Sequence, residues 1–140
     1  MDLFRPLEAS GSGMAAERFR LDLIAENLAN METTRAERAP DGSWLPYRRK
    51  VPLFVTRPEE GGVEVAGVIR VGRPDGSDLP RRYDPAHPDA DREGYVRLPN
   101  VDLVKEMTDL ITATRAYEAN VAAVNAFKAM FRKALEIGRA

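Results

Sequence analysis

The sequence predicts an α+β fold in which two long terminal helices pair as a coiled coil and a small, mostly antiparallel β module is inserted between them. Near both ends of the chain, apolar residues recur with alternating steps of four and three, the heptad spacing of paired helices. All of the ten prolines except Pro6 lie between residues 32 and 99, where they disfavour long helices. The predicted segments are therefore residues 1–34, 35–98 and 99–140.

The first segment carries the weaker heptad. Its positions are Leu3, Leu7, Ser10, Met14, Glu17, Leu21, Ile24, Leu28 and Met31. The run Ser10–Gly13 costs a helix roughly 1 kcal/mol per glycine relative to alanine. Three outcomes stay open for the first dozen residues: a hinge, a separate short helix, or a helix ordered only when a partner binds.

The middle segment has the spacing of short strands and turns. Residues 47–55, which contain Pro52, and residues 63–71, which alternate apolar and polar side chains, are predicted strands. Residues 58–62 form the loop between them, and Asp75-Gly76 is a predicted tight turn. A short strand at 95–98 leads into the last segment.

The last segment predicts one long helix. Its heptad seam is Leu103, Met107, Leu110, Thr114, Tyr117, Val121, Val124, Phe131 and Leu135, interrupted at Lys128. Asn100 is the expected N-cap, and Gly138 is expected to end the helix in a left-handed conformation. Ala122 and Ala126 lie off the seam, so the helix is apolar or small around much of its circumference. One partner helix cannot cover that surface, which predicts contacts with other subunits.

Composition excludes several function classes. The net charge of −1 and the pI near 5.9 give no electrostatic argument for nucleic-acid binding, and a chain without cysteine has no disulfide or thiolate chemistry. No apolar run approaches the length of a membrane span. Asp2, Arg5 and Glu8 interrupt the N-terminus, which does not resemble a cleaved secretory signal.

Two acidic stretches suggest metal binding, and we weigh both against a plain turn. His87 lies among aspartates but has no second histidine or cysteine to complete a zinc site. Asp89, Asp91 and Glu93 match the first half of a calcium loop, but the twelfth position is Asn100 instead of a bidentate glutamate. We therefore predict rigid turns in both places.

We also find no catalytic pattern. The basic run 48–50 is interpreted as a solvated strand face, and Gly11-x-Gly13 lacks the preceding strand of a phosphate loop. No serine or threonine has a plausible base beside it. We expect no enzyme activity, no cofactor and no small-molecule substrate.

Several separate motifs resemble those of one family. ASGSGMAAERFRLDLIAENLANMETT (residues 9–34) closely resembles the N-terminal signature of flagellar rod and hook proteins, with its Ser-Gly start and its Asn-x-x-Asn pair at Asn27 and Asn30. Residues 46–54, 83–107 and 115–120 are similar to short proteins of the proximal rod. Phe19 and the Met31-Glu32 pair depart from the usual pattern. Only residues 57–80 carry no matching motif.

The resemblance implies a structural subunit of the bacterial flagellar basal body. Its expected partners are other rod proteins, copies of itself, and the flagellar type III export apparatus, which needs no cleaved signal. The residues expected at its assembly interfaces are Leu21, Ile24, Asn27, Leu28, Asn30, Leu103, Met107, Leu110, Tyr117, Asn120, Val121, Ala122, Val124, Ala126 and Phe131. The alternatives are a soluble coiled-coil adapter, a small calcium-binding module with helical ends, or another short rod protein.

Overall fold

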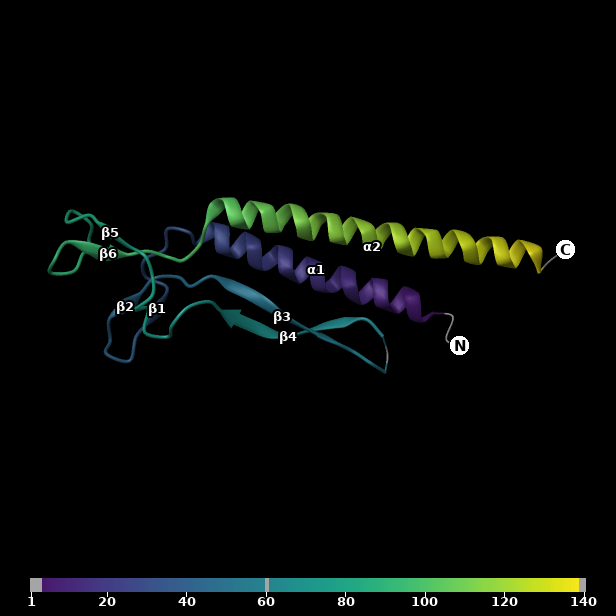
Figure 1. The fold of residues 1–140 in the computed structure, drawn as a ribbon, viewed down its shortest axis with the longest axis horizontal. Helices are drawn as coiled ribbons and strands as arrows, with labels where there is room; N and C mark the ends of the chain where they lie inside the picture. Colours follow the sequence, from purple (N-terminus) through teal and green to yellow (C-terminus); the bar gives the residue numbers. More distant parts are fainter. Residues whose placement is uncertain (1–3, 60, 139–140) are drawn as a thin grey trace. The chain divides into compact units, whose positions relative to one another are not determined.

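The computed structural model describes residues 4–59 and 61–138 and confirms the predicted α+β class (Figure 1). Helix α1 (Arg5–Ala29) precedes the strands, and helix α2 (Leu103–Ile137) follows them. The strands between the helices are β1 (Glu37–Arg38), β2 (Trp44–Leu45), β3 (Lys50–Thr56), β4 (Val63–Arg70), β5 (Arg81–Tyr83) and β6 (Tyr95–Arg97). Leu3, the first predicted heptad residue, lies outside the described residues.

The strands form three separate two-stranded sheets, β1–β2, β3–β4 and β5–β6. The first and third are antiparallel, with Trp44 opposite Arg38 and Val96 opposite Arg82. β3, β4 and β6 were predicted from sequence to within a few residues. β1, β2 and β5 were missed. β1 and β2 have two residues each, too few to show an alternating pattern, and β5 begins with the two charged residues Arg81 and Arg82.

The chain folds into two compact units. Unit 1 contains Met1–Asp22, Pro52–Gly67 and Leu110–Ala140, and unit 2 contains Leu23–Val51 and Val68–Asp109. Each unit therefore includes a part of both helices and a part of β3 and β4. The division into three consecutive segments stays a prediction.

Helix α1 runs without interruption through the Ser10–Gly13 run. Its first turn is closed by the Leu7 and Glu8 amides, which donate to the Phe4 carbonyl at 2.9 and 3.0 Å. The structure therefore shows neither a hinge nor a separate short helix at the glycines. That this part of α1 needs a partner for its order stays a prediction.

Both predicted ends of α2 need correction. Asp102, and not Asn100, caps the helix: its Oδ1 accepts from the Lys105 amide at 2.9 Å. Asn100 lies two residues earlier and bridges other segments instead. Gly138 is outside the left-handed region, and its amide continues the helical pattern by donating to the Ala134 carbonyl at 3.0 Å. Among the described residues, no helix is both long enough and apolar enough to cross a membrane.

Candidate assembly interface

Asn27 is the centre of a buried polar cluster in unit 2. Its Nδ2 donates to the Lys50 carbonyl at 2.9 Å and to Glu106 Oε2 at 3.1 Å. Its Oδ1 accepts from the Tyr47 hydroxyl at 2.8 Å and from the Lys50 amide at 2.9 Å. Both donor hydrogens and both acceptor sites of the amide are thus used, in a residue only 1% exposed. This cluster, the Asn27 hub, ties α1, the start of β3 and α2 together.

Arg49, directly before β3, and Lys50, its first residue, supply positive charges that pair with the acidic residues of the hub. The Arg49 guanidinium pairs with the Glu106 carboxylate, which is 0% exposed, and with Asp109 Oδ2 at 2.8 Å. Lys50 pairs with Glu26 on α1, and the Arg49 amide donates to Asn100 Oδ1 at 2.7 Å. A buried carboxylate needs such a partner because removing it from water costs several kcal/mol.

The prediction that residues 48–50 form a solvated face is therefore wrong. Arg48 is buried and pairs with Glu37 at 3.0 Å, while Arg49 and Lys50 face acidic residues of the two helices. The sequence interpretation failed because the partners Glu26, Glu37 and Glu106 are distant in the chain. Charge runs are usually solvated, and nothing local marks this one as an exception.

Tyr47 completes the hub from the residues between β2 and β3. Burial raises its pKa to about 12, and the nearby Glu26 and Glu106 carboxylates add to the effect because they disfavour a phenolate. The hydroxyl therefore remains a donor to Asn27 throughout the neutral range.

In unit 1, the two helices meet through a close contact between Gly13 and Asn120. A Cβ placed on Gly13 would lie 3.0 Å from Asn120 Nδ2, so only glycine lets the helices approach this closely without a shift of the Asn120 side chain. Phe4 contacts Phe127 and Phe131, with ring centroids 6.4 and 6.2 Å apart. Phe4, directly before α1, therefore lies beside the later turns of α2, which makes the helix pair antiparallel (Figure 1).

The buried seam of α2 is partly different from the predicted seam. Leu110, Tyr117 and Val124 were predicted and are half-buried. The alternate positions lie one residue earlier than predicted. They are Glu106, Ala113, Asn120 and Phe127. The predicted Met107, Thr114 and Lys128 beside them are exposed, whereas Val121 is half-buried like Asn120. This phase also explains the apparent interruption at Lys128, because the seam residue there is Phe127.

The other predicted interface residues divide by exposure. Ile24 and Asn27 are buried within α1, whereas Leu21, Leu28 and Asn30 are half-buried. On α2, Asn120 and Val121 are half-buried. Leu103, Met107, Ala122, Ala126 and Phe131 are exposed in the single chain. Phe131 nevertheless contacts Phe4 and Phe127 within unit 1. A role of these residues in assembly stays a prediction.

Helix α2 exposes large apolar side chains along much of its length. In unit 2, Leu103 is 50% and Val104 75% exposed, and in unit 1, Ile111, Met130 and Ile137 are more than half exposed. Exposed large apolar side chains that gather on a protein surface mark interaction sites. We give the name outer surface to nine exposed apolar residues of α2, three in unit 2 and six in unit 1. They are Leu103, Val104, Met107, Ile111, Ala122, Ala126, Met130, Leu135 and Ile137.

Sequence reasoning missed Tyr47, Arg49 and Glu106 as members of the hub. Glu106 could have been found, because it lies three and four residues from Leu103 and Leu110 and so falls in the phase of the seam. A charged residue at a seam position predicts a buried partner of opposite charge. Tyr47 and Arg49 carry no comparable signal.

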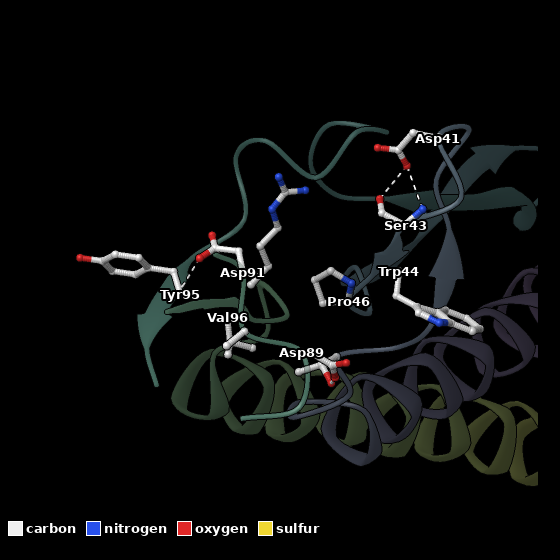
Figure 2. Close-up of a pocket in the computed structure, with 11 residues that line it drawn as sticks. Asp41, Ser43, Trp44, Pro46, Asp89, Asp91, Tyr95 and Val96 are labelled. Atoms are coloured by element: carbon white, nitrogen blue, oxygen red, sulfur yellow. Dashed lines mark hydrogen bonds between the residues drawn. The ribbon is translucent and has the colours of Figure 1, made fainter. Parts of the chain in front are cut away.

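A groove in unit 2 is lined by Asp89 and Asp91, two of the acidic residues considered as metal ligands (Figure 2). It has a volume near 400 Å³ and is lined by Asp41, Asp89, Asp91, Trp44 and Arg97, among others. Hydrogen bonds from Arg35 and Thr34 lower the pKa of Asp89. Those from the Tyr95 and Glu93 amides lower the pKa of Asp91. These carboxylates are thus occupied by donors of the chain itself.

The remaining residues of the two acidic stretches also serve the loops that contain them. His87 Nδ1 accepts from the Asp89 amide at 3.0 Å. Asn100, the twelfth position of the calcium pattern, accepts from the Arg49 amide and donates to the Val71 carbonyl at 2.9 Å. Within residues 4–59 and 61–138, no three His, Cys, Asp or Glu side chains are grouped as metal ligands.

Comparison with known proteins identifies relatives along the whole chain. A family model described as flagella basal body rod protein matches residues 7–36, and one described as the C-terminal part of flagellar basal body rod FlgEFG proteins matches residues 92–137. These regions contain Asn27 and Glu106. The flagellar basal-body rod protein FlgC of Bacillus subtilis is 45% identical over 99% of this chain and 100% of its own length. The FlgC proteins of Borreliella burgdorferi and of Escherichia coli O157:H7 are 42% and 39% identical, over 98% and 99% of this chain and 98% and 100% of their own lengths.

Proposed function

Because the chain belongs to the family of the flagellar basal-body rod protein FlgC, we propose that it is a structural subunit of the proximal rod, which polymerises through its terminal helices into the axial drive shaft of the bacterial flagellum. The observation that carries this proposal is the outer surface of α2. A single chain leaves these apolar residues in water, whereas a polymer covers them with neighbouring helices.

The Asn27 hub supports this role mechanically. A rod that transmits torque needs subunits whose helices keep a fixed register relative to the rest of the chain. The hub provides that register within unit 2, because a fully hydrogen-bonded buried network is satisfied in only one arrangement. Any slip of α1 along α2 there would leave Glu106 buried without Asn27.

The partners follow from the family. We propose that the subunit assembles with other rod proteins and with copies of itself, in the part of the basal body that spans the periplasm. We further propose that it reaches this place through the flagellar type III export apparatus. A structural role of this kind requires no catalysis and no cofactor.

Chemical cross-linking tests the proposal. The chain has no cysteine, so Ala122→Cys provides a single thiol on the outer surface to which a photoactivatable maleimide can be attached. We expect cross-links to other rod subunits in isolated basal bodies and none in a dilute solution of the purified chain. A stable stoichiometric dimer in dilute solution, measured by light scattering, would instead support the coiled-coil adapter.

A further inference from the structure

The first half of α1 is helical despite a sequence that disfavours it. Ser10–Gly13 contains two glycines, each of which costs roughly 1 kcal/mol of helix stability relative to alanine. The exposed apolar residues of the outer surface indicate that the helices are only partly covered in a single chain. Because short helices without packing are marginally stable, the first turns of α1 are expected to fray in a free chain. Contacts from another segment have to offset this cost if the helix is to persist.

The loop between β3 and β4 makes such contacts on the residues that are weakest. Ser12 Oγ accepts a hydrogen bond from the Val63 amide at 3.1 Å while donating to the Ala9 carbonyl at 2.9 Å. About two helical turns earlier, Arg5 donates from Nη2 to the Pro58 carbonyl at 3.0 Å. The loop therefore contacts α1 at two positions along the helix, Arg5 and Ser12, and both contacts lie within unit 1.

The fit between the loop and α1 depends on Gly62. Its φ of 92° belongs to the left-handed region, and a Cβ there would lie 2.1 Å from Ser12 Oγ and 3.1 Å from the Ala9 Cα. The loop is closed on itself by bonds from the Arg57 amide to the Gly62 carbonyl, at 3.0 Å, and from the Gly61 amide to the Arg57 carbonyl, at 2.8 Å. Gly62 of this loop thus packs against the small residues Ala9 and Ser12 of α1.

We propose that this loop, through Pro58, Gly62 and Val63, is a strap that keeps residues 5–20 of α1 helical in the free subunit, before any neighbour covers the helix pair. The strap lies on α1 at Ala9 and Ser12, while α2 contacts α1 at Gly13. The serine–glycine run is then a contact surface for two elements and not a point of flexibility. It also gives a role to the loop residues 57–59, 61 and 62, which lie in the part of the chain without a recognised motif.

Amide hydrogen exchange of the purified full-length chain tests the strap. In the wild type we expect measurable protection of residues 5–20. Gly62→Ala should expel the loop, and exchange in residues 5–20 should become roughly five- to tenfold faster, since about one hydrogen bond and its packing are lost. Amides of unit 2, such as those of residues 47–50, should exchange at the wild-type rate.

One serine variant and one glycine variant distinguish the effect of the strap from the effect of intrinsic helix propensity. Ser12→Ala raises intrinsic helix propensity but removes the acceptor for the Val63 amide. Gly11→Ala raises propensity where an added Cβ meets nothing within 4 Å. The strap predicts faster exchange of residues 5–20 in Ser12→Ala and slower exchange in Gly11→Ala. If wild-type residues 5–20 exchange as an unfolded chain, or if Ser12→Ala slows their exchange as Gly11→Ala does, the strap is refuted. Should Gly62→Ala unfold the whole chain, the serine variant alone decides.

Discussion

Asn27 Nδ2 donates to the Glu106 carboxylate at 3.1 Å, across the contact between α1 and α2, and both side chains are almost completely buried. A polar pair in a helix interface contributes less stability than an apolar pair but specifies which residues face each other. Arg49, Lys50 and Tyr47 supply the remaining partners of this pair, so the same contact that sets helix register attaches the start of β3 to both helices within unit 2.

Asn27→Ala is expected to lower the free energy of unfolding by about 2–4 kcal/mol. It leaves the Lys50 amide and carbonyl, the Tyr47 hydroxyl and Glu106 short of partners inside the protein. Urea unfolding followed by circular dichroism measures the change. Asn30→Ala is the matched control: the side chain of this half-buried asparagine bonds to the Glu26 carbonyl and the Thr33 hydroxyl, both nearby in sequence, and we expect a cost of about 1 kcal/mol or less. Equal costs for the two variants would contradict the hub.

Glu106→Gln tests the charge at the hub. The substitution keeps the shape but leaves the Arg49 guanidinium with Asp109 as its remaining counter-charge, and we expect a loss of about 2–3 kcal/mol. Asp109→Asn removes the other carboxylate that pairs with Arg49. This carboxylate is more exposed than that of Glu106, so its loss should cost about 1 kcal/mol or less. The two free energies, measured by urea unfolding, should keep this order, and the reverse order would show that Asp109 is the main partner.

The alkaline stability of the chain is expected to depend on Tyr47. Its folded-state pKa is raised to about 12 from 10.0, so the protonated phenol is favoured by folding. The corresponding stability is fully present below pH 10 and is lost as the pH rises from 10 to about 12, at about 1.4 kcal/mol per pH unit at most. Denaturant unfolding at several pH values in this window should show a shallower decline for Tyr47→Phe than for the wild type. Parallel declines would mean that the hydroxyl is not buried in the hub.

The heptad shows how far sequence reasoning reaches. Leu110, Tyr117 and Val124 were predicted correctly because every alternate seam position is large and apolar. The other half of the seam is Glu106, Ala113, Asn120 and Phe127, and three of these four are polar or small. A pattern based on hydrophobicity therefore shifted to the neighbouring Met107 and Val121, since a step of four is as helical as a step of three. The polar residues at these positions are the ones that carry the hub and the Gly13 contact.

The strands show a different limit. β3 and β4 have seven and eight residues, enough for a sequence pattern to appear, whereas β1 and β2 have two each. Arg48 to Lys50 could not be interpreted correctly because their partners lie on α1, β1 and α2. Burial of a charge depends on contacts with residues that are distant in sequence, whereas a local sequence pattern reports only neighbouring residues.

Calcium is expected not to bind at residues 89–100. The oxygens of Asp89 and Asp91 accept hydrogen bonds from Thr34, Arg35 and the amides of Glu93 and Tyr95, and a cation would have to displace these donors. Calorimetric titration should give no saturable heat in the micromolar range, and chelator should leave thermal unfolding unchanged. A one-to-one isotherm that disappears in Asp91→Asn would overturn this prediction.

The last prediction separates folding of the chain from assembly of the polymer. Ala122 is exposed on the outer surface of α2, so Ala122→Asp should change the unfolding free energy of the isolated chain by only about 0.5 kcal/mol. Val121, its neighbour, is half-buried, and Val121→Asp should cost about 1–3 kcal/mol.

In cells, both aspartate variants are expected to block rod growth and swimming, for different reasons. Val121→Asp weakens the packing of the subunit itself, whereas Ala122→Asp places a charge that assembly would have to remove from water. Ala122→Ser, similar in size and uncharged, is the control and should swim. If the chain is exported unfolded, none of the three should reduce the amount that reaches the periplasm, which immunoblotting of the periplasmic fraction measures. Normal swimming of Ala122→Asp cells would show that this surface meets no other subunit, and the argument from the uncovered apolar residues of α2 would fail at that position.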